Sequence, residues 1–176
     1  EQLTPQKAEE LLDKTVVAHR SIGTLSWTLR ELNETDPQLL AQLERTIGAG
    51  GFVRLIRANG TLADLYNILH HTSVEFRTKL VDKLSPEIAG EIIDKTIDNK
   101  QSVGTLHLGI RELRDTDYQL LRKLEQIITA SGFLRLVAAN GTLVEFFHAL
   151  HYSSFKFRLQ LVQHLTTEQA QYLVSK

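Results

Sequence analysis

The chain repeats its own sequence with an offset of 81 residues. Leu3–Thr15 returns as Leu84–Thr96, and Gly51–Leu62 returns as Gly132–Leu143. The offset holds without a gap, about half of the aligned positions are identical, and a third copy begins at Leu165 and stops at Lys176. A tandem repeat of this regularity predicts an array of similar structural units, because each unit stacks on its neighbour in sequence.

The composition predicts a folded domain and excludes several classes of site. The chain has 176 residues, 42% of them hydrophobic, which is enough to bury a core. Lys and Arg number 20 against 21 Asp and Glu, so no basic field indicates a nucleic-acid partner. Cysteine is absent, which excludes disulfides and thiolate metal sites and fits a cytoplasmic protein. No apolar run is long enough for a membrane span. Because the chain starts at a repeat boundary without Met, we expect a piece of a longer polypeptide or a mature product.

Apolar residues follow a helical spacing throughout, and we expect six helices in each copy plus a stub at the C-terminus. Short polar residues mark the helix starts. Gly48–Gly51 predicts a break between helices, since no strand and no Gly-Lys-Ser/Thr sequence accompany it as a phosphate-binding loop requires. The expected caps of the first copy are Thr4, Ser21, the segment Thr35-Asp36-Pro37, Thr61 and the pair Thr72-Ser73, and the expected inward positions include Leu11, Leu25, Leu29, Leu39, Leu43 and Ile47.

A weaker repeat lies inside the strong one. The segment from Gly23 aligns with the segment from Gly60 at a step of 37 residues, which indicates a unit of three helices in about 40 residues. In period and helix pattern the chain resembles armadillo and HEAT repeats. That resemblance implies an all-α, right-handed α-solenoid over 1–176: four three-helix units in two copies (3–83 and 84–164), and a truncated third copy (165–176) whose helix caps the array. Two tandem death-fold-like adaptor domains are the alternative, although such domains have no internal duplication.

The glycines mark the corners of the expected units. Gly23, Gly60, Gly104 and Gly141 should occupy equivalent positions at the start of each middle helix. Asn59-Gly60 and Asn140-Gly141 should include a left-handed backbone residue. Each of these pairs also begins an Asn-x-Thr sequon, as Asn33 does, but a helix corner needs the same residues, so we favour the turn.

No arrangement of residues indicates catalysis or a cofactor. There is no cysteine nucleophile and no Gly-x-Ser-x-Gly elbow. Glu145, His148 and His151 lie on one helical face as metal ligands can, but in the first copy only the last histidine is kept, as His70. A histidine at a helix end stabilises the helix dipole, and we favour that role. We therefore expect a protein that is not an enzyme, with no metal and no cofactor.

Recurring arginines open a nucleic-acid alternative. The pairs Arg30/Arg111, Arg54/Arg135 and Arg77/Arg158 could form a row that follows phosphates. Charge balance argues against it, and ion pairs within the array explain recurrent arginines equally well. High-salt sensitivity of binding would distinguish the two functions.

The second helix of each copy provides the candidate binding residues. Trp27 lies opposite the inward stripe of its helix, and Leu108 takes its place in the second copy. The helix is either buried on both sides or presents an apolar anchor to a partner. Arg30-Glu31 returns intact as Arg111-Glu112 while neighbouring polar residues change. We expect these six residues to bind a protein or peptide along an extended face of a scaffold. The identity of the partner and the oligomeric state are beyond the sequence.

Overall fold

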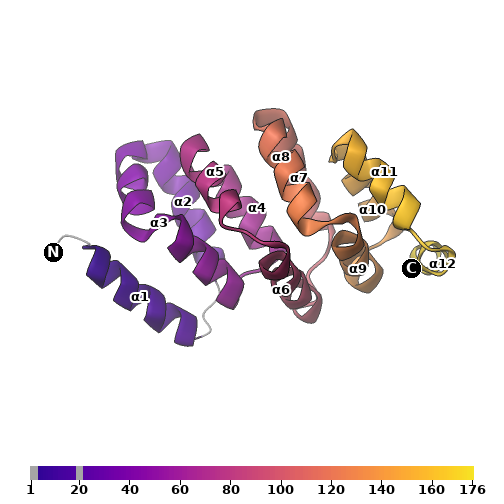
Figure 1. The fold of residues 1–176 in the computed structure, drawn as a ribbon, viewed down its shortest axis with the longest axis horizontal. Coiled ribbons are helices and arrows are strands. Elements are labelled where there is room, and N and C mark those ends of the chain that lie inside the picture. The colour runs from indigo at the N-terminus through magenta and orange to yellow at the C-terminus, as the bar shows by residue number, and fades with distance from the viewer. Residues whose placement is uncertain (1–3, 19–21) are drawn as a thin grey trace. The chain divides into compact units, whose positions relative to one another are not determined.

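The computed structural model describes residues 4–18 and 22–176, and within them it contains twelve α-helices and no strand (Figure 1). The all-α prediction is confirmed. The chain divides into two compact units, residues 1–84 (unit 1) and 85–176 (unit 2), so the division lies one residue from the boundary between the sequence copies.

Each unit contains the same succession of helices. Unit 1 consists of α1 (Pro5–Val17), α2 (Gly23–Thr35), α3 (Pro37–Asn59), α4 (Leu62–His71) and α5 (Val74–Asp82). Unit 2 consists of α6 (Pro86–Asp98), α7 (Gly104–Thr116), α8 (Tyr118–Ile128), α9 (Ala130–Asn140), α10 (Leu143–Tyr152), α11 (Phe155–His164) and α12 (Thr167–Ser175).

A kink in α3 and the extra helix α12 together account for the difference in helix number. Gly48 has φ 70° and ψ 159° and interrupts the helical backbone within α3. Thr129, its counterpart in unit 2, has φ 62° and ψ 151° and separates α8 from α9. The predicted break at the glycine-rich segment is thus confirmed, and α3 is equivalent to α8 and α9 together.

Within each unit, the packing of most helices follows the 37-residue repeat. In unit 1, α1 packs on α3, α2 on α4, and α3 on α5. In unit 2, α6 packs on α9, α7 on α10, α11 on α8 and α9, and α12 on α9. Neighbour-on-neighbour packing of this kind is what a helical array of three-helix units produces.

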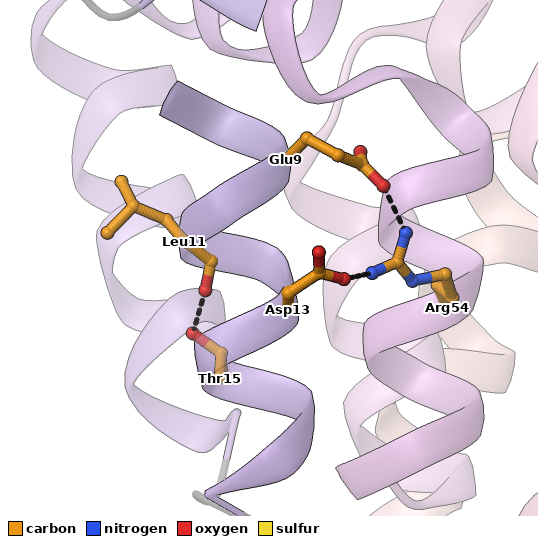
Figure 2. A network of polar contacts seen from close by, with 5 residues as sticks. All are labelled: Glu9, Leu11, Asp13, Thr15 and Arg54. Carbon is orange, nitrogen blue, oxygen red and sulfur yellow. Dashed lines mark hydrogen bonds and ion pairs between the residues drawn. The ribbon is translucent and has the colours of Figure 1, made fainter. Parts of the chain in front are cut away.

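Polar contacts join α1 to the second half of α3. The guanidinium of Arg54 donates hydrogen bonds to the carboxylates of both Glu9 and Asp13 (Figure 2). The amide of Asn59 donates to the backbone oxygen of Thr15, at the end of α1, over 3.0 Å. Unit 2 repeats both contacts: Arg135 pairs with Asp94 at 2.7 Å, and Asn140 donates to the oxygens of Thr96 and Ile97. Asn59 and Asn140 therefore close the C-terminus of a neighbouring helix, which satisfies carbonyls that the helix leaves free.

A buried glutamate positions the last helix of each full copy. Glu44 of α3 accepts hydrogen bonds from the backbone N–H and the hydroxyl of Ser73, the N-cap of α5, over 2.7 and 2.6 Å. Glu125 and Ser154 make the same pair of contacts in unit 2. Burial raises the pKa of Glu125, although the bonds from Ser154 oppose the shift.

Most predicted helix starts are confirmed. Thr4, Asp36, Thr61 and Ser73 accept the N-capping bonds predicted for them. Ser21 lies outside the described residues. Two inward assignments are wrong, because Leu11 and Leu39 are exposed.

The prediction of a left-handed residue at the helix corners is wrong. Gly60 and Gly141 have extended backbones with φ −97° and −90°. Glycine is needed there for space: a Cβ on Gly60 would lie 2.9 Å from the Cα of Ile56, and one on Gly141 would lie 2.7 Å from the oxygen of Val137. The prediction that all four glycines begin a middle helix is only partly confirmed. Gly23 and Gly104 begin α2 and α7, but Gly60 and Gly141 are the C-caps of the preceding helices α3 and α9.

The leucines that follow these glycines are unequally buried. Leu62 and Leu106 are fully buried as predicted, but Leu25 and Leu143 are only half-buried.

The truncated third copy forms a helix, as predicted. Thr166 and Gln169 make a capping box at the start of α12, and Leu173 is buried where the helix packs on α9. None of the described helices is long and apolar enough to cross a bilayer.

Candidate functional site

Trp27 projects from α2 into solvent. Leu29, two residues further on, is fully buried and fixes the inner face of the helix. Trp27 lies on the opposite side and is 71% exposed. Of the two interpretations of this residue, the one with α2 buried on both sides is therefore wrong, and the indole is accessible to a partner.

The indole borders a hollow of about 180 Å³ between α2 and α4. Ser26, Trp27 and Arg30 line it from α2, and Asn67 and His71 line it from α4. The guanidinium of Arg30 lies over the Trp27 ring, 6.0 Å from its centroid, and donates to Glu34 over 3.1 Å. A flat aromatic face, a positioned cation and an amide thus surround one opening, and these groups can stack and form hydrogen bonds.

His71 is uncharged at neutral pH. Burial, together with the charges of His70 and Arg30 and against the opposing charge of Glu34, lowers its pKa to about 4. A neutral imidazole adds a donor and an acceptor to the hollow without repelling Arg30.

In unit 2, aromatic rings occupy the equivalent place. His107 replaces Ser26, His148 replaces Asn67 and Tyr152 replaces His71. The His107 ring centroid lies 5.1 Å from that of His148 and 6.3 Å from that of Tyr152. Arg114 adds a cation 6.0 Å from the Tyr152 centroid. Because these side chains are larger than their counterparts and pack on one another, the two copies present different surfaces at this position.

The structure brings some of the predicted residues together and leaves others apart. Trp27 and Arg30 share the hollow, but Arg30 pairs with Glu34 instead of Glu31, which is exposed further round α2. In unit 2, Leu108 and Arg111 are exposed on α7 and Glu112 is half-buried.

A larger hollow, of about 560 Å³, lies between α3 and α5 of unit 1 and contains none of the predicted residues. Most of its polar side chains pair with one another, since Glu44 accepts from Ser73 and Glu75 pairs with Lys79 over 2.6 Å. We favour the smaller hollow as the candidate site, because an exposed aromatic side chain borders it.

The residues considered for metal and phosphate binding have structural contacts. Glu145 accepts from the hydroxyl of Ser102 and from the backbone N–H of Gly104 over 2.7 Å, so it caps α7 from α10. Burial raises the pKa of Glu145, but these hydrogen bonds outweigh it and the net pKa is below the ordinary value. No group of three or more metal-binding side chains occurs in the part of the chain that the structure describes.

Part of the arginine row is engaged in contacts within the units. Arg54 and Arg135 form the ion pairs of the helix contacts described above, and Arg77 is buried.

Comparison of the chain with protein-family models, with curated proteins and with solved structures gave no match in any of the three.

Sequence reasoning missed Asn67 and His71, which form the α4 side of the hollow. It also missed the buried pair Glu44 and Glu125. The glutamates could have been found, because a carboxylate lies on the apolar stripe of Leu40 and Ile47 in both copies. The hollow could not have been found from the sequence, because it depends on how α2 packs on α4.

Proposed function

We propose that the protein is a non-catalytic helical-repeat module that binds a protein or peptide, and that the hollow between α2 and α4 is its principal contact site. The observation that carries this proposal is the exposed Trp27 beside Arg30, at the edge of an opening lined by Asn67 and His71. Tryptophan and arginine are the residue types that most often dominate binding energy at protein interfaces.

We further propose that the helices continue as a right-handed α-solenoid of four three-helix units. Packing of α2 on α4 and of α7 on α10, which are equivalent helices of the 37-residue repeat, supports this architecture over a pair of death-fold-like bundles, which lack such an internal repeat. The step from this architecture to binding is a fold-level analogy.

Nucleic-acid binding through the arginine row is the competing function. It is weakened by the contacts of Arg54 and Arg135, whose charges are balanced by Glu9, Asp13 and Asp94. A row that followed phosphates would need these guanidinium groups turned outward without acidic partners.

Selection of random peptides displayed on phage against the full chain tests the proposal. We expect enriched peptides whose affinity for Trp27→Ser and Arg30→Ala variants falls at least about tenfold, corresponding to about 1.4 kcal/mol. Leu108→Ser and Arg111→Ala are matched controls at the same repeat positions in unit 2, and circular dichroism checks that all four variants keep their helices.

Two results would overturn the proposed site. One is that selected peptides bind Trp27→Ser as tightly as the unchanged chain. The other is that no peptide is enriched while a DNA or RNA oligonucleotide binds with a steep dependence on salt, which would favour the arginine row.

A further inference from the structure

The same hollow occurs in both units but differs greatly in size. In unit 1 the hollow between α3 and α5, which we name the α3–α5 hollow, has a volume of about 560 Å³. In unit 2 the hollow between α8 and α11, the α8–α11 hollow, has a volume of only about 10 Å³. Every residue that lines the α8–α11 hollow is equivalent, at the offset of 81 residues, to a residue that lines the α3–α5 hollow. One feature of the repeat is therefore open in unit 1 and nearly closed in unit 2.

An arginine distinguishes the lining of the nearly closed hollow. Arg122 takes the place of Ala41, whose short side chain leaves the α3–α5 hollow open. Burial raises the pKa of Glu125, the buried carboxyl group of the α8–α11 hollow, and the positive charge of Arg122 is among the causes that oppose this shift. Unit 2 thus provides a guanidinium for its own buried carboxylate.

Among the residues that the structure describes, the equivalent carboxylate of unit 1 has no such partner. Glu44 is 5% exposed and accepts hydrogen bonds from the backbone N–H and the hydroxyl of Ser73. These two bonds leave lone pairs free, because an ionised carboxylate has about four acceptor sites. Arg45 also lines the hollow, but in the described part of the chain it forms no ion pair with Glu44. Lys79, the other basic residue of the lining, pairs with Glu75 over 2.6 Å.

The charges of the two linings differ in the same sense. Two basic side chains and one acidic side chain line the α8–α11 hollow, whereas two of each line the α3–α5 hollow, which is therefore more negative by one unit of charge. A buried carboxylate is stabilised by a cation that also forms hydrogen bonds with it. Guanidinium suits this role better than ammonium, because its planar set of N–H donors matches the geometry of a carboxylate.

We propose that the α3–α5 hollow binds an arginine side chain of a partner protein, which supplies to Glu44 the cation that Arg122 supplies in unit 2. The incoming guanidinium donates to the free lone pairs of Glu44 while Ser73 keeps its own bonds. The α3–α5 hollow shares no lining residue with the hollow at Trp27, so this is a second contact site, beyond the function proposed above.

A nuclear magnetic resonance titration of the full chain tests the proposal. The backbone N–H of Ser73 donates to Glu44 over 2.7 Å, so its resonance responds to a cation at that carboxylate. The probe is acetyl-arginine methylamide, which imitates an arginine within a peptide. We expect a saturable shift of the Ser73 resonance and none of Ser154, which makes the same contact in unit 2. The matching citrulline compound, which has a similar shape without the charge, should have no effect.

Exchange of residues between the copies provides matched variants. Ala41→Arg gives unit 1 the arginine of unit 2 and should weaken binding of the probe at least about tenfold. Arg122→Ala should do the opposite, because it opens the α8–α11 hollow and makes the Ser154 resonance respond. Each substitution introduces the residue that the other copy has at the same position, so both variants should fold. Trp27→Ser should leave the Ser73 response unchanged, which separates this site from the hollow at Trp27.

The proposal fails if the Ser73 resonance shows no saturable shift up to about 10 mM probe, a concentration that covers weak binding. It also fails if the citrulline compound shifts Ser73 equally, or if the response persists undiminished in Ala41→Arg. Tighter binding of free arginine than of the capped probe would contradict a protein partner and assign the hollow to the amino acid itself.

Discussion

Gly48 and Thr129 occupy the same repeat position and nearly the same backbone conformation, but only one of them is a glycine. A positive φ with ψ near 150° is costly for any residue with a Cβ. Thr129 partly offsets this cost, because its hydroxyl accepts the N-capping bond from the N–H of Gly132 over 3.2 Å. Backbone conformation at this one residue therefore separates two helices in each unit.

Replacement of Gly48 by Ala should destabilise the protein by about 1–2 kcal/mol, because it forces a Cβ to positive φ. The matched control is Gly50→Ala, two residues away. A Cβ at either glycine meets nothing within 4 Å, and only Gly48 has a positive φ. The control should be stabilising by about 0.5–1 kcal/mol, since alanine is favoured over glycine within a helix. Urea unfolding measures both changes, and equal effects of the two substitutions would contradict the account.

His71 should make stability depend on pH in the acidic range. Its folded-state pKa is about 4, against an ordinary value of 6.5, so between these values the unfolded chain binds a proton that the folded chain does not. The stability that His71 contributes is present above about pH 6.5 and is lost as the pH falls toward 4. Compared with the unchanged chain, His71→Gln should therefore lose less unfolding free energy between pH 7 and pH 4. The exposed His164→Gln is the control, and identical pH profiles for the unchanged chain and His71→Gln would refute this role.

At the scale of helices, much of the fold could be predicted from the sequence. Helix starts at Thr4, Asp36, Thr61 and Ser73 follow from local hydrogen bonds, which sequence encodes directly. The corner at Gly60 was predicted for the wrong reason, because close approach to Ile56 is a packing property that turn preferences do not contain. Leu11 was assigned inward from its spacing, but spacing defines a face of a helix and not whether another element covers it.

The candidate site divides in the same way. The position of Trp27 on α2 follows from helical geometry. That Asn67 and His71 line the same hollow as Trp27 depends on the packing of α2 on α4.

Docking of α1 depends in part on the ion pairs of Arg54. We expect Arg54→Met to cost no more than about 1 kcal/mol at low salt, since both partners are exposed and methionine retains the apolar stem. The cost should shrink in about 1 M salt, where charges are screened within a few ångströms. Urea unfolding of both chains at the two salt concentrations measures this loss of unfolding free energy. An undiminished cost in high salt would mean that packing, and not charge, joins Arg54 to α1.

For the whole molecule, the two copies differ at the candidate site while retaining the contacts that build each unit. The pairs Arg54/Arg135, Asn59/Asn140 and Glu44/Glu125 make the same interactions in both units. Around Trp27, by contrast, small and polar side chains border a hollow, and in unit 2 rings take their place.

The most direct test of this account is to transfer the rings of unit 2 into unit 1. The variant Ser26→His/Asn67→His/His71→Tyr keeps Trp27 and Arg30 but fills the hollow. Trp27 is the only tryptophan of the chain, so its fluorescence reports on this site alone. Titration with a phage-selected peptide should change the emission of the unchanged chain saturably and leave that of the folded variant unchanged. An equal response from both proteins, or binding of the peptide without any change in Trp27 emission, would contradict the assignment of the hollow as the binding site.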